Sequence, residues 1–507
     1  MDFPDAKPLP ARPAWERAAA RAAVLALAIY AFVLVRHVGA VAASSDSSGY
    51  MNHAKLFMRH RLHIMPRVIP GLPAEGVPPY LYVPLGFKPA WNGEGLVPTY
   101  PTGFPLLVLA AVPFAGWRYA GDLAIIVNSL AGLAATYLLG RALGLGRPWS
   151  LVGAAILALS PLYLFMSVQA MSDVPSLVWT TLAVLAALRS RKKDSWAVAA
   201  GAAIAIDVLL RPTNVLAFVP VLTALGASRR RWVLFGLGGV PGAVFFCVHS
   251  LDAYGSLLAT GYGDNTVDFG AAYVAPTLKH YAYWLPLLLT PVVVLNLGLP
   301  WMRGERALSR WLIGVWILVF AVFFSTYKCT HETWWYLRFL LPAVPALIVG
   351  GLLGARALLK RAPAWADPGR TPAAFAAVIL LVIADLGPRI RDRSPLLAGA
   401  DELKYMHVTD WMKDHVPADA VCLSMQETGS LIYYTSFRFV RWDVLNPGNV
   451  SQVESAIRAA GLPLYAVLFP FEIEQGALAT HMPGRWTEVG KVEDVTIFRR
   501  DFGASHP

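Results

Sequence analysis

The chain has 507 residues, of which 56% are hydrophobic and 15% are charged, and its mean hydropathy is +0.50. Soluble globular proteins carry about 25% charged residues, so this composition excludes one large soluble enzyme, and its apolar content excludes a disordered chain. The net charge of +11 comes from short Lys and Arg clusters between long apolar runs, which indicates a polytopic membrane protein and not a nucleic-acid-binding one. Three cysteines are too few and too scattered for a disulfide framework or a zinc site.

The first apolar stretch covers about residues 18–43 and follows a short basic N-terminus. Ala40-Val41-Ala42 is similar to a signal-peptide cleavage site, but the apolar run is too long for a typical signal peptide and many spans follow. We therefore expect an uncleaved helix that enters from the cytoplasm and leaves the membrane near Ser44.

The long segment of residues 45–119 is rich in proline, glycine, aromatic and charged residues, so it cannot lie in hydrocarbon unprotected. Within it, residues 50–61 mix apolar and basic side chains, which favours a helix in the plane of the interface. Residues 104–117 are apolar, but a run of about 14 residues is too short to span and predicts an interfacial or re-entrant segment.

Further apolar runs predict spans at residues 120–140, 148–168, 174–189, 232–250, 285–301, 310–326, 337–355 and 372–387. Residues 196–228 differ, because two short apolar runs are broken at Arg211-Pro212, where proline disfavours helix. Basic clusters flank this region on both sides, so we predict a helical hairpin with Arg211 at its tip on the outer face. With the hairpin counted as two helices, the sequence predicts about eleven transmembrane helices and an outward C-terminus.

From about Arg389 the pattern changes to that of a soluble α/β domain. Residues 401–415 and 451–460 are predicted helices, the second with a capping box of Ser451 and Glu454. Short strands are predicted at residues 420–425, 431–434, 439–442 and 464–469. The predicted fold is therefore an all-α polytopic membrane domain over residues 1–388, which includes the outer loop 45–119, and a small α/β extracytoplasmic domain over residues 389–507.

Two carboxylates lie at the predicted outer face. Asp46 comes where the first helix leaves the membrane, a place where a carboxylate costs little, and it also suits the N-cap of the interfacial helix. Asp173 joins two spans, and Pro175 in a first helical turn makes Ser172 or Asp173 a natural cap. The predicted topology places Asp46 and Asp173 in one outer layer, where both can line one cavity.

Cations and hydroxyl groups at the same face can hold an anionic headgroup. Tyr100 lies at the polar–apolar boundary, where it is either a functional hydroxyl or an aromatic anchor. Arg338 lies just inside an apolar span, where it either snorkels to the interface or clasps a phosphate with its planar fork. The other outer-face cations are Lys88, Arg211, Lys328 and His331.

Asp207 lies inside the first helix of the hairpin, and an ionisable group at such a depth is a functional candidate. Arg211 follows four residues later, so an i,i+4 ion pair between the two is the simpler expectation.

Several motifs in one order resemble the GT-C superfamily of membrane glycosyltransferases. An aspartate just past the first span is followed by Tyr-Pro-x-Gly-Phe-Pro-Leu-Leu at residues 100–107 and by Met-Ser-Asp-Val-Pro at residues 171–175. Leu-Leu-Arg-Pro-Thr-Asn at residues 209–214 and Tyr-Leu-Arg-Phe-Leu-Leu-Pro-Ala-Val-Pro at residues 336–345 complete the set. The resemblance covers about residues 18–355 and is closest to bacterial proteins similar to protein O-mannosyltransferases and to the aminoarabinose transferase of lipid A.

The resemblance implies transfer of a sugar from a polyprenyl phosphate to an acceptor hydroxyl at the outer face. It implies Asp46 as the general base, or as the group that orients the acceptor, and Asp173 as a residue that shapes the acceptor site. The donor-phosphate residues are expected to be Arg338, Tyr336, Tyr100, Lys88 and Arg211. The acceptor pocket is expected to include Tyr50, His53 and His331.

The chain departs from the family pattern in two places. Asp46 is followed by Ser47 where many relatives carry a second acid, and Thr99 and Tyr100 stand where the lipid A relatives have an acid and a lysine. Both changes argue against transfer of aminoarabinose to lipid A. They also leave the use of a divalent metal open, and no other cofactor is expected.

We therefore predict a glycosyltransferase of the inner membrane that acts by one displacement with inversion, on a glycan, lipid or protein acceptor. The alternative is a transporter or flippase of lipids or solutes, because such proteins also have broken helices and charges at depth. The sequence has no clear internal repeat, and its suspected polar cluster lies at the outer face, which argues against transport. A third interpretation makes the tail the functional part, but one or two helices would suffice as its anchor.

Overall fold

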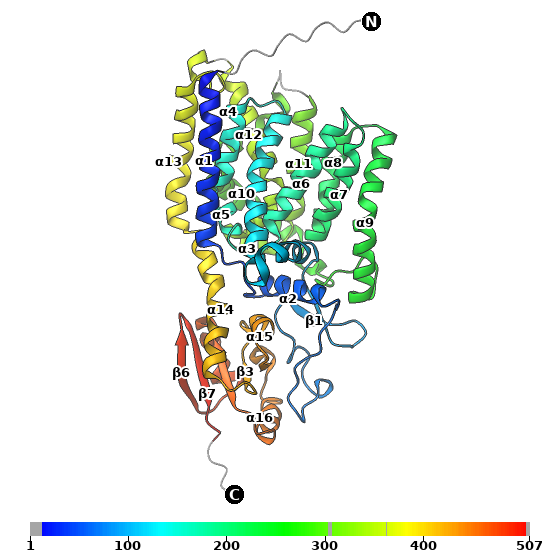
Figure 1. Ribbon diagram of the computed structural model, residues 1–507, viewed down its shortest axis with the longest axis vertical. Helices are drawn as coiled ribbons and strands as arrows, with labels where there is room; N and C mark the ends of the chain where they lie inside the picture. Colours follow the sequence, from blue (N-terminus) through cyan, green and yellow to red (C-terminus); the bar gives the residue numbers. More distant parts are fainter. Residues whose placement is uncertain (1–12, 303–306, 361, 503–507) are drawn as a thin grey trace.

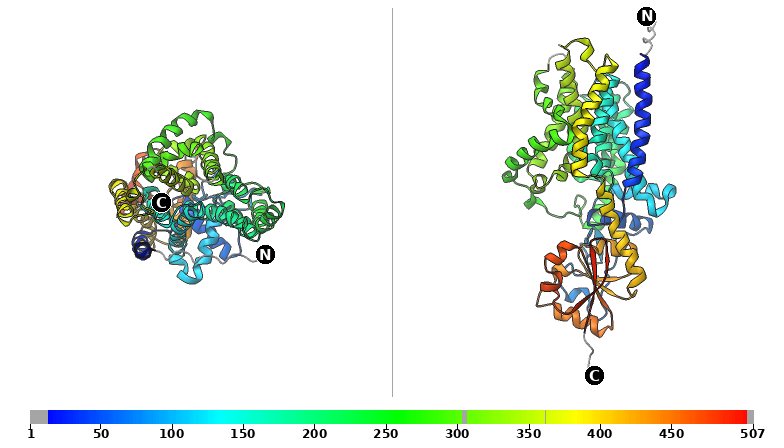
Figure 2. Two further views of the ribbon diagram at one scale, coloured as in Figure 1. Left: turned by 90° about the horizontal axis from the view of Figure 1, so that it is seen from above. Right: turned by 90° about the vertical axis from the view of Figure 1, so that its left-hand side faces the viewer.

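The computed structural model describes residues 13–302, 307–360 and 362–502. Helices pack side by side in one half of the molecule, and a small domain built on a β-sheet forms the other end (Figure 1). Helix α2 (Asp46–Met58) lies across the boundary between the two halves. Helix α1 (Ala14–His37) begins at the pole far from the sheet, and strand β7 (Val495–Arg500) ends at the opposite pole (Figures 1 and 2).

The helical half follows the predicted apolar runs. Its α-helices are α1, α3 (Gly103–Ala142), α4 (Arg147–Leu159), α5 (Pro161–Met166), α6 (Asp173–Ser190), α7 (Trp196–Leu210), α8 (Phe218–Leu225), α9 (Arg229–Tyr254), α10 (Val274–Leu289), α11 (Ala307–Ser325), α12 (Val344–Leu359) and α13 (Pro372–Arg393). Three 3₁₀ segments join them: η2 (Pro212–Ala217), η5 (Pro291–Trp301) and η7 (Trp334–Ala343). Among the described residues, six helices are long and apolar enough to cross a membrane, or seven with one bent pair, so the count of eleven stays a prediction.

The chain breaks helices where the sequence indicates it, with one exception. Gly116 interrupts α3 with φ 65°, a conformation that glycine adopts without strain, and so divides the short apolar run from the following span. Arg211 is extended between α7 and η2, which confirms the predicted hairpin. The single span predicted at residues 285–301 is wrong, because the chain bends by 114° between α10 and η5. Thr290 has φ 68° there, and Pro291 lacks the N–H that would continue the helix.

The C-terminal domain has a five-stranded sheet in the order β4-β3-β5-β7-β6. Its strands are β3 (Val421–Leu423), β4 (Arg438–Val440), β5 (Leu464–Leu468), β6 (Trp486–Val492) and β7. Strands β3, β4 and β5 are parallel, whereas β7 is antiparallel to both β5 and β6. Its α-helices are α14 (Leu397–His415), α15 (Thr428–Tyr434), α16 (Val450–Ala459) and α17 (Pro470–Glu474).

Two predictions for this domain are wrong. Residues 431–434 form helix α15 and not a strand, because the periodicity of a four-residue apolar run cannot distinguish the two. The capping box at Ser451 is absent, since α16 begins one residue earlier after Asn449, and the Glu454 carboxylate pairs with Arg500 instead.

The first outer segment shares a core with the C-terminal domain. Ile69, Leu72, Leu81 and Tyr82 are buried in the cluster that contains the β3 and β5 side chains. The backbone N–H of Arg441 donates to the Leu81 carbonyl at 3.0 Å. A short antiparallel pair in the same segment, β1 (Phe87–Pro89) and β2 (Leu96–Pro98), lies close to α2. The segment and the domain therefore fold as one body over the end of the bundle.

Candidate active site

Two neighbouring ion pairs lie at the end of the bundle that faces the sheet domain. Asp46 is the first residue of α2, and Ser45 holds the N-cap position that was predicted for Asp46. Arg338, 292 residues away in η7, donates from Nη2 to Asp46 Oδ2 at 3.0 Å. The Asp46 side chain is 24% exposed and that of Arg338 is 16% exposed. A carboxylate and a guanidinium predicted from separate motifs thus meet in a place that solvent reaches.

A second ion pair joins Asp173, the first residue of α6, to Arg211 at the hairpin tip. The Asp173 side chain is only 3% exposed. The two pairs are neighbours, because the guanidinium carbons of Arg211 and Arg338 lie 5.2 and 5.4 Å from the centre of the same Phe339 ring. The structure therefore gathers both predicted carboxylates and both predicted arginines into one cluster.

The prediction of an ion pair between Asp207 and Arg211 is wrong. Helix α7 ends at Leu210, and the extended backbone of Arg211 (φ −150°, ψ 114°) carries its side chain off the helix face. The Asp207 carboxylate is fully buried and instead accepts hydrogen bonds from the Thr180 hydroxyl and from Asn214 Nδ2. Asp207 fixes the hairpin to α6, and Arg211 is left to reach Asp173.

Two tyrosine hydroxyls border the cluster. Tyr50, on α2, is 2.9 Å from the Ser172 hydroxyl, and Tyr100 is 2.8 Å from the Ser45 hydroxyl. Burial, and next the nearby Asp46 charge, raises the pKa of Tyr100 well above its usual range. Burial, and then Tyr262 and Asp46, does the same to the pKa of Tyr50. Both phenols stay protonated at neutral pH, so each can donate a hydrogen bond and neither is a base there.

The close approach of two glycines brings β1 to this site. A Cβ on Gly86, which has φ 86°, would lie 2.6 Å from the Cα of Gly49 in α2. Lys88 follows in β1, with its ammonium 5.5 Å from the centre of the Tyr254 ring. Among the described residues, the Lys88 ammonium has no ion pair or hydrogen bond, and burial lowers its pKa. Lys88 is therefore a cation that is free to receive an anion.

Tyr262 borders the cluster, although no motif in the sequence marks it. Its ring meets that of Tyr100 edge-on, with centroids 6.0 Å apart, and its hydroxyl lies within electrostatic reach of Asp46, Arg211 and Arg338. The residue is 45% exposed, so it stands at the open side of the cluster. Its only local signal in the sequence is an aromatic residue between two glycines, Gly261 and Gly263, in the segment between the predicted spans 232–250 and 285–301.

The remaining predicted site residues have different surroundings. Tyr336 lies 5.8 Å from the Arg338 guanidinium and stacks on Phe339. His53 is fully buried, with its ring 5.3 Å from that of His249 on α9. His331 stacks on Tyr273, and Lys328 pairs with Asp268 at 2.6 Å. The contacts that define the cluster thus involve Tyr336 but not His53 or His331, whose acceptor-pocket role stays a prediction.

Helix α15 of the C-terminal domain holds α2 in place. Asn52 Nδ2 donates to the Gly429 carbonyl at 3.0 Å, and Lys55 Nζ donates to the Tyr433 carbonyl at 2.7 Å. The backbone N–H of Ala42 donates to the Tyr434 hydroxyl at 3.1 Å. The position of Asp46 is therefore set by the C-terminal domain as well as by the bundle.

Within the described part of the chain, no group of three His, Cys, Asp or Glu side chains is arranged to hold a metal ion. The two carboxylates of the cluster are each paired with an arginine. In this arrangement the Asp46 carboxylate can polarise a bound hydroxyl, which is the role of a general base. Lys88 and the two arginines can stabilise an anion next to it.

A family model matches part of the chain. Residues 119–249, which cover α6, the hairpin and most of α3 and α9, match a family model described as dolichyl-phosphate-mannose-protein mannosyltransferase. No curated protein matches the chain in sequence.

Solved structures with the same architecture cover nearly the whole chain. ArnT from Cupriavidus metallidurans, bound to undecaprenyl phosphate, superposes with a TM-score of 0.56 at 14% identity over 96% of this chain and 99% of its own. The oligosaccharyltransferase of Archaeoglobus fulgidus gives a TM-score of 0.52 at 13% identity over 89% of this chain and 70% of its own. The arabinofuranosyltransferase AftD from Mycobacteria gives 0.53 at 15% identity over 94% of this chain and 40% of its own. The predicted resemblance to the GT-C superfamily is thereby confirmed.

Proposed function

We propose that this chain, a membrane protein with the fold of the GT-C glycosyltransferases, transfers a sugar from a polyprenyl phosphate to an acceptor hydroxyl. The observation that carries the proposal is the contact of Asp46 with Arg338 in a solvent-accessible cluster at one end of the bundle. The structural neighbours support the donor class, because ArnT was solved with undecaprenyl phosphate and the Archaeoglobus fulgidus enzyme AglB with dolichol phosphate and an inhibitory peptide.

In the proposed reaction, Asp46 removes the proton of the acceptor hydroxyl while that oxygen bonds to the anomeric carbon. The bond from this carbon to the phosphate oxygen breaks, and its electron pair leaves on the polyprenyl phosphate. One displacement of this kind inverts the anomeric centre. Asp46 suits the role of base better than Asp173, because it is the more exposed carboxylate of the two. General base catalysis typically contributes a factor of about 10²–10⁴.

The cations of the cluster stabilise the charge that the leaving phosphate gains. Arg338 and Arg211 each use part of their guanidinium on a carboxylate, which leaves further N–H groups for an anion. Lys88 has no such partner in the described part of the chain. We therefore assign the first contact with the donor phosphate to Lys88, with Arg338, Arg211 and the Tyr100 hydroxyl as further donors and Tyr336 behind Arg338.

A small cavity of about 20 Å³ lies next to the cluster, between the hairpin, α9 and the loop before α10. Its walls are mostly apolar, and they include Leu209 and Pro212, which flank Arg211 in the sequence. The cavity is too small for a prenyl chain, so the lipid part of the donor has to lie along the outside of this apolar wall.

The test uses the full chain in liposomes that contain polyprenyl phosphates loaded with a hexose, a pentose or an aminopentose, together with soluble acceptor mixtures. Released polyprenyl phosphate is measured by mass spectrometry. We expect release from at least one donor, with a loss of about 10²-fold or more in Asp46→Asn and no loss in Asp419→Asn, which changes an exposed carboxylate of the C-terminal domain. Release no greater than in empty liposomes, or equal release by the native chain and Asp46→Asn, contradicts the proposal.

The transporter alternative makes a different prediction in the same liposomes. A lipid transporter moves a labelled polyprenyl phosphate between leaflets without breaking the sugar–phosphate bond. Intact donor that changes leaflet, with no free polyprenyl phosphate, would favour transport over transfer.

A further inference from the structure

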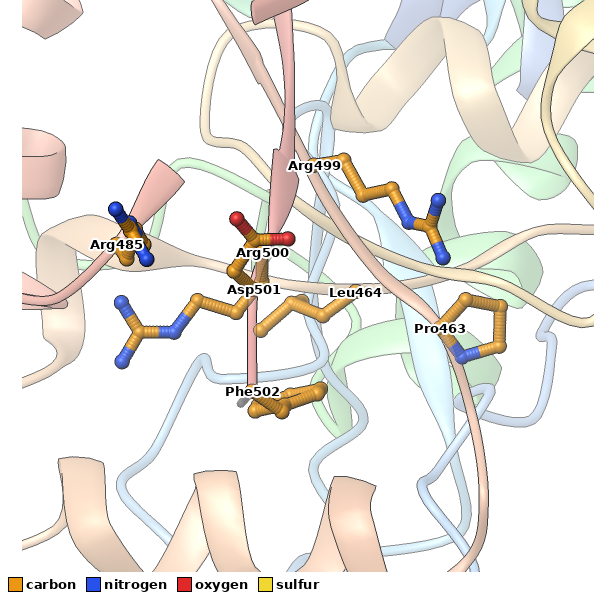
Figure 3. A pocket seen from close by; sticks show the side chains of 7 residues that line it. All are labelled: Pro463, Leu464, Arg485, Arg499, Arg500, Asp501 and Phe502. Carbon is orange, nitrogen blue, oxygen red and sulfur yellow. The ribbon is translucent and has the colours of Figure 1, made fainter. Parts of the chain in front are cut away.

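A second basic site lies in the C-terminal domain, outside the cluster described above. It is a cavity of about 460 Å³ at the end of β7 and the beginnings of β5 and β6. Figure 3 shows its lining, in which the guanidinium groups of Arg485 and Arg500 lie on one side and that of Arg499 on the other. The other lining residues are Pro463, Leu464, Asp501 and Phe502.

The arginines differ in what already binds them. Arg485 and Arg499 are exposed, and neither side chain has an ion pair or hydrogen bond within the described residues. Arg500 is 8% exposed, and its Nη2 donates to the Glu454 carboxylate and to the Pro483 carbonyl. Its Nε and Nη1 are covered by protein and have no acceptor among the described residues. The exposed guanidinium groups of Arg485 and Arg499 are therefore the donors that an oxyanion in the cavity can reach.

The cavity also offers a flat apolar surface. The Phe502 ring lies under the guanidinium of Arg458, 4.6 Å from the ring centre, and Pro463 and Leu464 extend the surface. The one carboxylate in the lining, Asp501, accepts a hydrogen bond from the Thr487 hydroxyl at 3.2 Å. The lining has three guanidinium groups and one carboxylate, so its net charge is positive. Its volume of about 460 Å³ lies within the usual range for small-molecule sites, about 300–1,000 Å³.

The position of the cavity excludes a membrane lipid as its ligand. Strand β7 ends at the pole of the molecule opposite to the helical bundle, so the ligand arrives from water (Figures 1 and 2). A sugar with an acidic group matches both features of the lining, because its ring face can stack on Phe502 while its oxyanion accepts from the forked donors of arginine.

We propose that this cavity binds a water-soluble anionic sugar, one that bears a carboxylate or a phosphate, as part of the acceptor. The requirement for an anion rests on the arginines alone, whereas the role in acceptor binding rests on the proposed function. The distal site would then hold a long acceptor at a second point, far from the residue that reacts.

The test measures binding of labelled tetragalacturonate, and separately of mannose 6-phosphate, to the full chain in detergent micelles. Maltotetraose is the neutral control and tetraglutamate the acidic peptide control. We expect one of the two acidic sugars to bind at least tenfold more tightly than maltotetraose, and the double variant Arg485→Gln/Arg499→Gln to weaken that binding at least tenfold. Arg391→Gln, which removes an exposed arginine outside the cavity, should leave it unchanged.

Each outcome bears on the proposal. The carboxylate and phosphate arms show which oxyanion the site prefers. Equal binding of maltotetraose, or binding that the double variant does not weaken, overturns the site. Tighter binding of tetraglutamate than of either sugar overturns the carbohydrate assignment and favours an acidic peptide. Both altered arginines are exposed, so we expect the double variant to keep the unfolding midpoint of the native chain. Measurement of that midpoint shows whether the variant is folded. Asp46→Asn should bind the sugar normally, so a failure of the proposed reaction can be distinguished from a failure of this site.

Discussion

The two ion pairs of the cluster contain the same chemical groups in different surroundings. Asp46 begins α2 and pairs with Arg338 of η7 at the open side, whereas Asp173 begins α6 and pairs with Arg211 at the tip of the hairpin. The Asp46 side chain is 24% exposed and that of Asp173 is 3% exposed. A carboxylate that solvent reaches can exchange its arginine partner for a substrate, but one that is sealed in protein cannot do so without rearrangement.

The difference also concerns free energy. A buried ion pair loses much of its attraction to desolvation, but the removal of one partner leaves an unpaired buried charge and costs about 3–5 kcal/mol. The two arginines are almost equally exposed, at 16% for Arg338 and 15% for Arg211, so the two pairs differ mainly at the carboxylate, which solvent reaches at Asp46 and not at Asp173. We therefore infer that the Asp46 pair serves the reaction and the Asp173 pair serves the fold, and each of the following changes tests that division.

The largest effect is expected for Asp46→Asn. Asparagine keeps the size of the side chain but cannot accept a proton, so kcat should fall by about 10²–10⁴. The unfolding midpoint should fall less than in Asp173→Asn, because solvent reaches the Asp46 end of its ion pair. Release of polyprenyl phosphate and thermal unfolding of the same preparation measure the two quantities. A large loss of stability with normal kcat would reverse the division.

Asp173→Asn should have the opposite profile. It leaves the Arg211 charge buried without its carboxylate, so we expect a loss of about 3–5 kcal/mol in the free energy of unfolding. The double variant Asp173→Asn/Arg211→Gln should regain part of that loss, because the unpaired charge is gone. Chemical unfolding in detergent gives the four values of the cycle. Additive losses in the double variant would show that the two side chains are not coupled.

Lys88→Met should act on donor binding. A charge-assisted hydrogen bond contributes about 1.5–3 kcal/mol, so the KM for the polyprenyl-phosphate donor should rise at least tenfold with little change in kcat. Lys279→Met is the control, since Lys279 is an exposed lysine outside the cluster. If KM stays constant in Lys88→Met and rises in Arg338→Lys, the arginine of the accessible pair is the main phosphate contact.

The sequence was sufficient for the residues that local rules position. Asp46, Asp173 and Arg211 each stand at a helix end that proline or a change in polarity marks, so topology alone placed them in one layer. The sequence did not predict contacts between side chains that are far apart in the chain. Arg211 pairs with Asp173 because the Arg211 backbone is extended, and a sequence pattern does not predict that conformation. Tyr262 reaches the site through a loop, and hydrophobic periodicity does not predict the path of a loop.

The same limit applies to the C-terminal domain. The buried strands β3 and β5 were found as apolar runs, but the hairpin of β6 and β7 was not, because polar residues alternate irregularly along β6. Helix α15 was taken for a strand, although its packing against α2 is the contact that ties the domain to Asp46. Tertiary contacts determine the secondary structure of both segments, and such contacts cannot be inferred from one sequence alone.

The smallest effect is expected for Tyr100→Phe. The change removes a neutral hydroxyl that contacts Ser45 and lies near Asp46, and a neutral hydrogen bond contributes about 0.5–1.5 kcal/mol, which is a two- to tenfold fall in kcat/KM. Because burial and Asp46 raise the pKa of Tyr100 well above its usual range, its hydroxyl does not titrate between pH 5 and 9. The pH profile of kcat/KM should therefore keep its shape in Tyr100→Phe, and Tyr80→Phe, on an exposed loop, should change neither height nor shape. If instead the basic limb of the profile disappears in Tyr100→Phe, the phenol ionises during turnover, and the role of base passes from the accessible carboxylate to its neighbour.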